Sequence, residues 1–191
     1  MKKALEKYFT DIWNVPNVLT MLRLALIPVF VILYVNGHDK LALLVFIIAS
    51  LTDLLDGYLA RKNNQITAFG KLMDPLADKV MVCTALICQA SSGIIPWFAV
   101  IIVMLKELLM LIGAAVMLHN DVVVYSNLLG KTAMCAFVAA LVLSFYHAEF
   151  AALGFQLDSI LLWISVVLTL AALVDYTAAG IRVLKNKKNQ A

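Results

Sequence analysis

Apolar residues along the chain gather into six long runs separated by short polar segments. The runs cover residues 17–36, 40–61, 72–91, 94–118, 128–147 and 159–184. Each is close to the roughly 20 residues that an α-helix needs to cross about 30 Å of hydrocarbon. No segment alternates apolar and polar residues as a membrane β-strand would, and a helix satisfies its own backbone hydrogen bonds in lipid. The pattern predicts an all-α integral membrane protein with six transmembrane helices.

Residues 1–13 have a mixed apolar and basic pattern instead. On a helix, one face would hold Leu5, Tyr8, Phe9, Ile12 and Trp13, with Lys2, Lys3 and Lys7 lying elsewhere. This amphipathic pattern is typical of a helix that lies in the membrane interface. The apolar run that follows is too long for a signal-peptide core and has no small-residue cleavage site after it, so we interpret it as a retained first span. Without repeats or linkers, we expect one domain over residues 1–191.

Composition supports the membrane assignment. Hydrophobic residues make up 63% of the 191 residues and charged residues only 14%, whereas soluble domains are usually about half apolar and a quarter charged. A soluble globule of this size has too little interior for so much apolar surface. Disordered proteins, secreted disulfide scaffolds and soluble nucleic-acid binders are excluded, and we expect no nucleic-acid partner. The three cysteines lie in apolar runs, and the three histidines fall in predicted loops without a ligand-like spacing.

Basic residues indicate the orientation. They gather at the two termini, in the 61–71 loop and at the start of the fifth run: Lys2, Lys3, Lys7, Arg61, Lys62, Lys71, Lys131, Lys185, Lys187 and Lys188. The opposite loops offer only Lys40. Because cytoplasmic loops carry the excess of lysine and arginine, both termini and the 61–71 loop are expected in the cytoplasm. The protein is then a multi-pass protein of the cell (inner or plasma) membrane.

Four carboxylates stand out at the cytoplasmic ends of the second and third runs. Asp53 and Asp56 are three residues apart on one predicted helix, and Asp74 and Asp78 are four apart on the next. Each spacing places a pair on one helix face, and a hairpin would bring the two pairs together. Each charge at membrane depth costs roughly 2.5–3.5 kcal/mol, so such residues are functional candidates. Hard oxygen donors without cysteine or histidine favour Mg²⁺, Mn²⁺ or Ca²⁺.

The alternative is that each aspartate pairs with a nearby base, but Arg61, Lys71 and Lys79 are too few for this. Small residues accompany the acids, since Gly57 follows Asp56 directly and Ala60 lies one turn on. A helical glycine costs about 1 kcal/mol relative to alanine, which favours close approach by a ligand over helix packing alone. Arg61 then provides a fixed cation suited to phosphate oxygens.

These positions together match the full signature D-x2-D-G-x2-A-R-x8-G-x3-D-x3-D. The eight fixed residues are Asp53, Asp56, Gly57, Ala60, Arg61, Gly70, Asp74 and Asp78. In this the chain resembles the CDP-alcohol phosphotransferase family. The resemblance implies two divalent ions, Mg²⁺ or Mn²⁺, bound by the four aspartates. It also implies a CDP pocket and a homodimer, with Asp78 as general base. The pocket would be lined by Asp56, Gly57, Ala60, Arg61 and Gly70.

The acceptor is indicated by the opening of the first run. Its pattern N-x-P-N-x-L-T-x-x-R, ending at Arg23, resembles bacterial phosphatidylglycerophosphate synthases, and CMP-releasing cardiolipin synthases share much of it. Arg23 would contact a substrate phosphate or form a structural ion pair, and Asn17 and Thr20 would face the site or cap the helix. A phosphorylated acceptor also needs cations, and Lys131 and Lys106 are the candidates. Phosphatidylglycerophosphate synthases commonly have Arg-Glu where this chain has Lys106-Glu107, and a longer G-K-x-K-T where it has Gly130-Lys131-Thr132.

The resemblance implies transfer of a phosphatidyl group from CDP-diacylglycerol to glycerol 3-phosphate, releasing CMP. The alternative within the family is cardiolipin synthesis with phosphatidylglycerol as acceptor. A divalent-cation transporter is a third hypothesis, since intramembrane carboxylates also mark ion pathways. A transporter would place its acids at mid-bilayer, often with repeat symmetry, whereas these acids lie near one membrane face.

Overall fold

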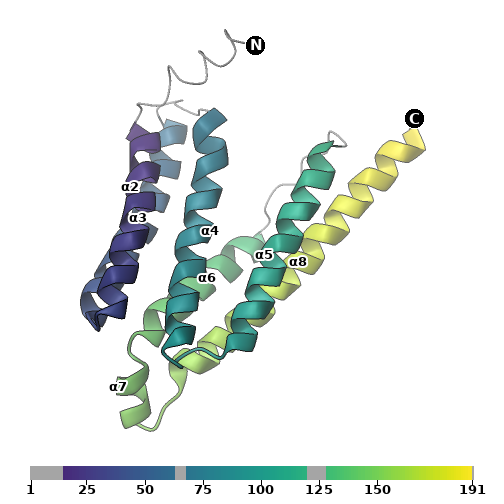
Figure 1. The fold of residues 1–191 in the computed structure, drawn as a ribbon. Helices are drawn as coiled ribbons and strands as arrows, with labels where there is room; N and C mark the ends of the chain where they lie inside the picture. The colour runs from purple at the N-terminus through teal and green to yellow at the C-terminus, as the bar shows by residue number, and fades with distance from the viewer. Residues whose placement is uncertain (1–14, 63–67, 120–127, 191) are drawn as a thin grey trace. The chain divides into compact units, whose positions relative to one another are not determined.

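The computed structural model describes residues 15–62, 68–119 and 128–190 (Figure 1). Its elements are α2 (Val15–Val35), α3 (Asp39–Lys62), α4 (Ala68–Ser91), α5 (Trp97–His119), α6 (Leu128–Ser144), α7 (His147–Ala152) and α8 (Leu157–Gln190). Within these ranges every regular element is a helix, which confirms the all-α class. The amphipathic helix predicted for residues 1–13 lies outside the described residues.

The long helices follow the apolar runs closely. Three described stretches are long and apolar enough to cross a membrane, namely Asn17–Val35, Trp97–Met117 and Leu157–Val183, and α6 is a shorter apolar helix. Large apolar side chains cover the outer surfaces of these helices, as on Ile32, Ile101 and Val167. The chain is therefore a membrane protein. That α3 and α4 also cross, giving six spans, stays a prediction.

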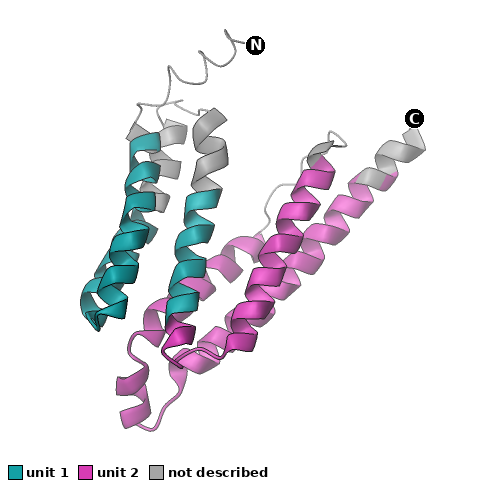
Figure 2. Cartoon of the chain, viewed as in Figure 1, with its two compact units in different colours: residues 1–88 teal, residues 89–191 magenta. Residues whose placement is uncertain are grey.

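The chain divides into two compact units, residues 1–88 and 89–191 (Figure 2). In the first unit, α2 packs along α3 as an antiparallel hairpin. Gly37 forms the turn with a φ of 74°, a left-handed conformation that glycine adopts without steric cost after a helix. Phe30 of α2 contacts Phe46 of α3 with ring centroids 6.2 Å apart. The buried Ala42 and Ala49 let the two backbones approach closely.

In the second unit, α8 is the central helix, and both α5 and α6 pack against it. Phe98 of α5 stacks on Trp163 of α8 with ring centroids 4.9 Å apart. Farther along both helices, Gly180 of α8 lies so close to Met117 that an added Cβ would fall 1.7 Å from the methionine Cε. Because the two contacts occur in the same order along α5 and α8, these helices run parallel.

One predicted boundary differs from the structure. The run expected over 128–147 ends as a helix at Ser144, and the short α7 begins at His147. The amides of Phe145 and Tyr146 donate to carbonyl oxygens three residues earlier rather than four. This tighter winding is typical of a terminating turn, and the Ser144 hydroxyl adds a bond to the Leu141 carbonyl oxygen at 2.8 Å. The apolar pattern continues past this point, so the break was not visible in the sequence.

Candidate active site

All eight signature positions lie in helical backbone. Asp53 to Arg61 fall within α3, and Gly70 to Asp78 fall within α4. The spacings of three residues in α3 and four residues in α4 are therefore helical spacings, as expected. The side chains of residues 53–75 lie outside the part of the structure that is described. That the four carboxylates meet, and that Gly57, Ala60, Arg61 and Gly70 line a pocket with them, remains a prediction.

Asp78 is the signature aspartate whose side chain is described. It is half-buried, and it borders a buried stripe of α4 formed by Ala77, Met81 and Ala85. The described side chains contain no group of three or more histidine, cysteine, aspartate or glutamate residues able to hold a metal ion. The sequence from Asp53 to Asp78 contains neither cysteine nor histidine. Its donor set is thus carboxylate oxygen alone, which fits Mg²⁺ or Mn²⁺ and not a thiolate-binding metal.

Three polar side chains are buried on α2. Asn17, Thr20 and Arg23 are each only 1% exposed. Arg23 lies two helical turns before Phe30, on the side of α2 that contacts α3. The hairpin register follows from the Phe30–Phe46 contact. Arg23 lies seven residues before Phe30, and Asp53 lies seven residues after Phe46, so their backbones occupy the same level along the hairpin. That Asn17, Thr20 and Arg23 face a substrate beside the aspartates stays a prediction.

The two candidate lysines belong to the second unit and have different surroundings. Lys106 is buried within α5 and forms an ion pair with the adjacent Glu107. Lys131 lies in the first turn of α6 with an exposed side chain. Lys106 already has a carboxylate partner, whereas Lys131 is accessible to a ligand. Their approach to the aspartates stays a prediction.

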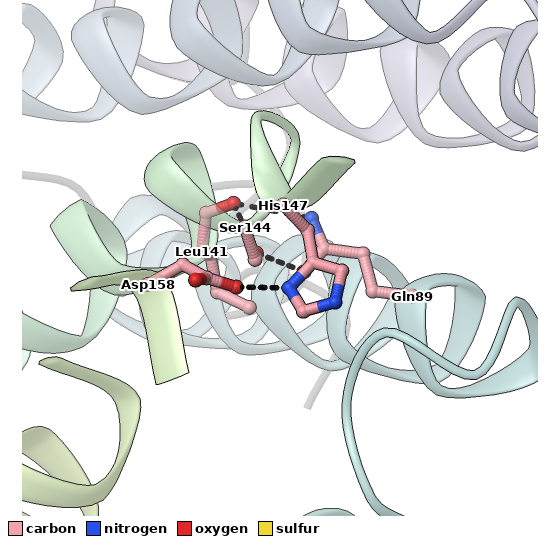
Figure 3. Close-up of polar contacts among 5 residues, drawn as sticks. All are labelled: Gln89, Leu141, Ser144, His147 and Asp158. Atoms are coloured by element: carbon pink, nitrogen blue, oxygen red, sulfur yellow. Dashed lines mark hydrogen bonds and ion pairs between the residues drawn. The ribbon is translucent and has the colours of Figure 1, made fainter. Parts of the chain in front are cut away.

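A polar cluster that the sequence analysis does not predict lies where α6 ends and α8 begins (Figure 3). His147 Nδ1 lies 2.6 Å from Oδ2 of Asp158, a side chain that is only 2% exposed. Nearby, the buried Gln89 donates to the Leu141 carbonyl oxygen at 3.1 Å and accepts from the Ser144 hydroxyl. The available signal was an aspartate within an apolar stretch, 11 residues after a histidine across a predicted turn. These residues lie outside the signature, and we assign them no part in the chemistry.

Comparison with known proteins places these observations in a family. The family model for CDP-alcohol phosphatidyltransferase matches residues 13–171. A Bacillus subtilis (strain 168) protein named CDP-diacylglycerol–glycerol-3-phosphate 3-phosphatidyltransferase is 34% identical over 189 residues, which cover 91% of this chain and 98% of the relative.

Two other relatives with the same name match over shorter regions. The protein of Rickettsia typhi is 51% identical over 72 residues, 36% of this chain and 40% of the relative. That of Cereibacter sphaeroides is 46% identical over 90 residues, 44% of this chain and 41% of the relative. The family match spans both compact units and includes the complete signature. The chain belongs to the CDP-alcohol phosphatidyltransferase family.

Proposed function

We propose that the protein is a phosphatidylglycerophosphate synthase. It transfers a phosphatidyl group from CDP-diacylglycerol to glycerol 3-phosphate, forming phosphatidylglycerophosphate and releasing CMP. The observation that carries this proposal is the match to a relative bearing that enzyme name over 98% of the relative's length. The complete aspartate signature on two helices supports the same chemistry.

Asp53, Asp56, Asp74 and Asp78 would hold two divalent ions, Mg²⁺ or Mn²⁺. Four carboxylates brought together from two successive helices would repel one another strongly, and two divalent cations would balance their charge. When bound, such ions neutralise the diphosphate and make CMP a better leaving group.

The chain's own residues bind the donor and move one proton. Arg61 would bind phosphate oxygens of CDP-diacylglycerol, because a guanidinium matches phosphate geometry. Gly57, Ala60 and Gly70 would leave room for the nucleotide. Asp78 would accept the proton of the acceptor hydroxyl. The hydroxyl oxygen then forms a bond to the phosphorus that carries the diacylglycerol, and the bond from that phosphorus to the oxygen of CMP breaks.

The acceptor site would be formed by Asn17, Thr20, Arg23, Lys106 and Lys131. The burial of Asn17, Thr20 and Arg23 supports this, because a charged side chain enclosed in an apolar helix is costly and is a candidate for function. Glycerol 3-phosphate is a small dianion, and holding it beside the donor supplies proximity for the reaction.

The distribution of lysine and arginine supports a reaction on the cytoplasmic side of the membrane. Both termini and the aspartates would face the cytoplasm, where glycerol 3-phosphate and CMP are soluble, while CDP-diacylglycerol and the lipid product stay in the membrane. A homodimer is expected from the family resemblance.

A cardiolipin synthase that uses phosphatidylglycerol is the second candidate, favoured by the shared opening segment that ends at Arg23. The two candidates differ only in the acceptor. A CMP-release assay on the purified protein with CDP-diacylglycerol and each acceptor in turn therefore tests the proposal.

A further inference from the structure

The connection between α6 and α8 exposes apolar side chains. This segment, residues 145–157, includes α7 and is called the α7 turn here. Leu153 is 70% exposed and Phe155 is 63% exposed, and Tyr146 and Leu157 are also open to the surroundings. A loop in water usually exposes polar residues at such positions, so these side chains need an apolar environment.

Several backbone amides of the α7 turn bond to carbonyl oxygens of the turn itself. The amides of Leu153, Gly154 and Phe155 donate to carbonyl oxygens of residues 149–151 at 3.0–3.3 Å. The tight turn is possible because Gly154 has a φ of 74°. Amides bonded in this way do not need water as a partner, which lowers the cost of entering lipid.

Two ionisable side chains at the ends of the turn contact each other. His147 at the start of α7 contacts Asp158 at the start of α8, and the Asp158 carboxylate is enclosed by protein. Between Lys131 and Arg182 the sequence has no lysine or arginine. Glu149 is the exposed acidic residue of the α7 turn, so the turn has no cation to attract anionic lipid head groups.

The turn lies at one end of a stretch long and apolar enough to cross the membrane. That stretch, Leu157–Val183 of α8, begins at the last residue of the turn. The exposed apolar surface of the turn continues onto α8 through Ile160, Ile164 and Val167. This part of α8 belongs to a stretch apolar enough to cross the membrane.

From these observations we propose that the α7 turn is inserted into the lipid interface at the end of α6. Leu153 and Phe155 contact acyl chains near the head groups, Glu149 faces water, and the His147–Asp158 pair holds the base of the turn closed. The partner of this surface is the lipid bilayer itself, and insertion does not depend on anionic lipid.

Site-directed spin labelling of the full-length protein tests the proposal. Single cysteines at Leu153, Phe155, Glu149 and Val167 are introduced after the native cysteines are replaced by alanine. The labelled proteins are reconstituted in phosphatidylcholine vesicles, with and without phosphatidylglycerol. Collision rates with oxygen, which enriches in lipid, are compared with those of a water-soluble nickel complex. Val167 on α8 is the lipid-facing reference, and CMP release by each labelled protein verifies that the fold is retained.

We expect the oxygen-to-nickel ratio at Leu153 and Phe155 to exceed one, as at Val167, and to be unchanged by phosphatidylglycerol. The ratio at Glu149 should fall below one. Ratios below one at Leu153 and Phe155 would place the turn in water and overturn the proposal. Low rates for both reagents together with spin–spin broadening would overturn it in favour of contact with a second copy of the chain.

Discussion

His147, the first residue of α7, and Asp158, the second residue of α8, form a polar contact of 2.6 Å. The aspartate is almost fully enclosed, and its second oxygen, Oδ1, has no hydrogen-bond partner among the described residues. The contact with His147 is therefore what offsets the cost of burying this carboxylate. Because the contact bridges the two ends of the α7 turn, it fixes where α8 begins relative to α6.

Replacing His147 by alanine should destabilise the protein by about 1–3 kcal/mol, because a buried acceptor loses its partner. Thermal unfolding in detergent, followed by tryptophan fluorescence, measures the change in Tm. The double variant His147→Ala with Asp158→Asn removes the charge that was left unpaired, so it should recover part of the loss. An unchanged Tm for His147→Ala would show that the contact contributes nothing to stability.

The proposed metal site predicts that Asp53→Asn and Asp74→Asn each abolish CMP release, since each removes a carboxylate ligand while preserving side-chain size. The matched control is Asp39→Asn, an exposed aspartate at the start of the same helix as Asp53, which should keep full activity. The wild-type protein should lose activity in EDTA and regain it with Mg²⁺ or Mn²⁺. Full activity in chelator would eliminate the two-metal hypothesis.

Arg23 should matter for catalysis as well as for folding. We expect Arg23→Gln to lower kcat/KM for glycerol 3-phosphate by about tenfold or more, because a charge-assisted contact is worth about 1.5–3 kcal/mol. Arg23→Lys keeps the charge and should retain more activity. Arg182→Gln, an exposed residue on α8, is the control. If Arg23→Gln lowers Tm but leaves both KM values and kcat intact, Arg23 is a structural residue only.

Lys131 is the cation on α6 that is open to a ligand. Lys131→Ala should raise the KM for glycerol 3-phosphate by about 10–150-fold, from the same charge-assisted contact, with little change in the KM for CDP-diacylglycerol. Steady-state kinetics with each substrate varied in turn measures the two effects. Lys185→Ala, exposed near the end of α8, serves as the comparison. Equal increases in both KM values would remove Lys131 from the acceptor site.

The helices were predictable because apolar periodicity and length are properties of the sequence itself. The ends of α2 and α5 lie within a few residues of the predicted runs for this reason. The break after Ser144 was not predictable, because the apolar pattern continues past it and the bond from the Ser144 hydroxyl to Gln89 joins residues 55 positions apart. The His147–Asp158 pair was missed for the same reason, since a histidine in a predicted loop carries no signal of what folds against it.

For the candidate site, the sequence predicts which residues take part but not where they lie relative to one another. The signature fixes which residues are candidates, and the helical backbone from Asp53 to Arg61 confirms their periodicity. The burial of Arg23 was anticipated as a need for a partner, but its level along the hairpin depends on the Phe30–Phe46 contact. The level of a residue along a helix hairpin depends on how the two helices pack, which the apolar pattern of the sequence does not determine.

The most direct test is an acceptor comparison with the purified protein in phosphatidylcholine vesicles that contain CDP-diacylglycerol and Mg²⁺. CMP release is measured with glycerol 3-phosphate or phosphatidylglycerol as the added acceptor, and the lipid product is identified by mass spectrometry. Asp74→Asn is the inactive control. We predict CMP and phosphatidylglycerophosphate with glycerol 3-phosphate, and neither CMP nor cardiolipin with phosphatidylglycerol. Cardiolipin formation from phosphatidylglycerol, with no product from glycerol 3-phosphate, would contradict the proposed function.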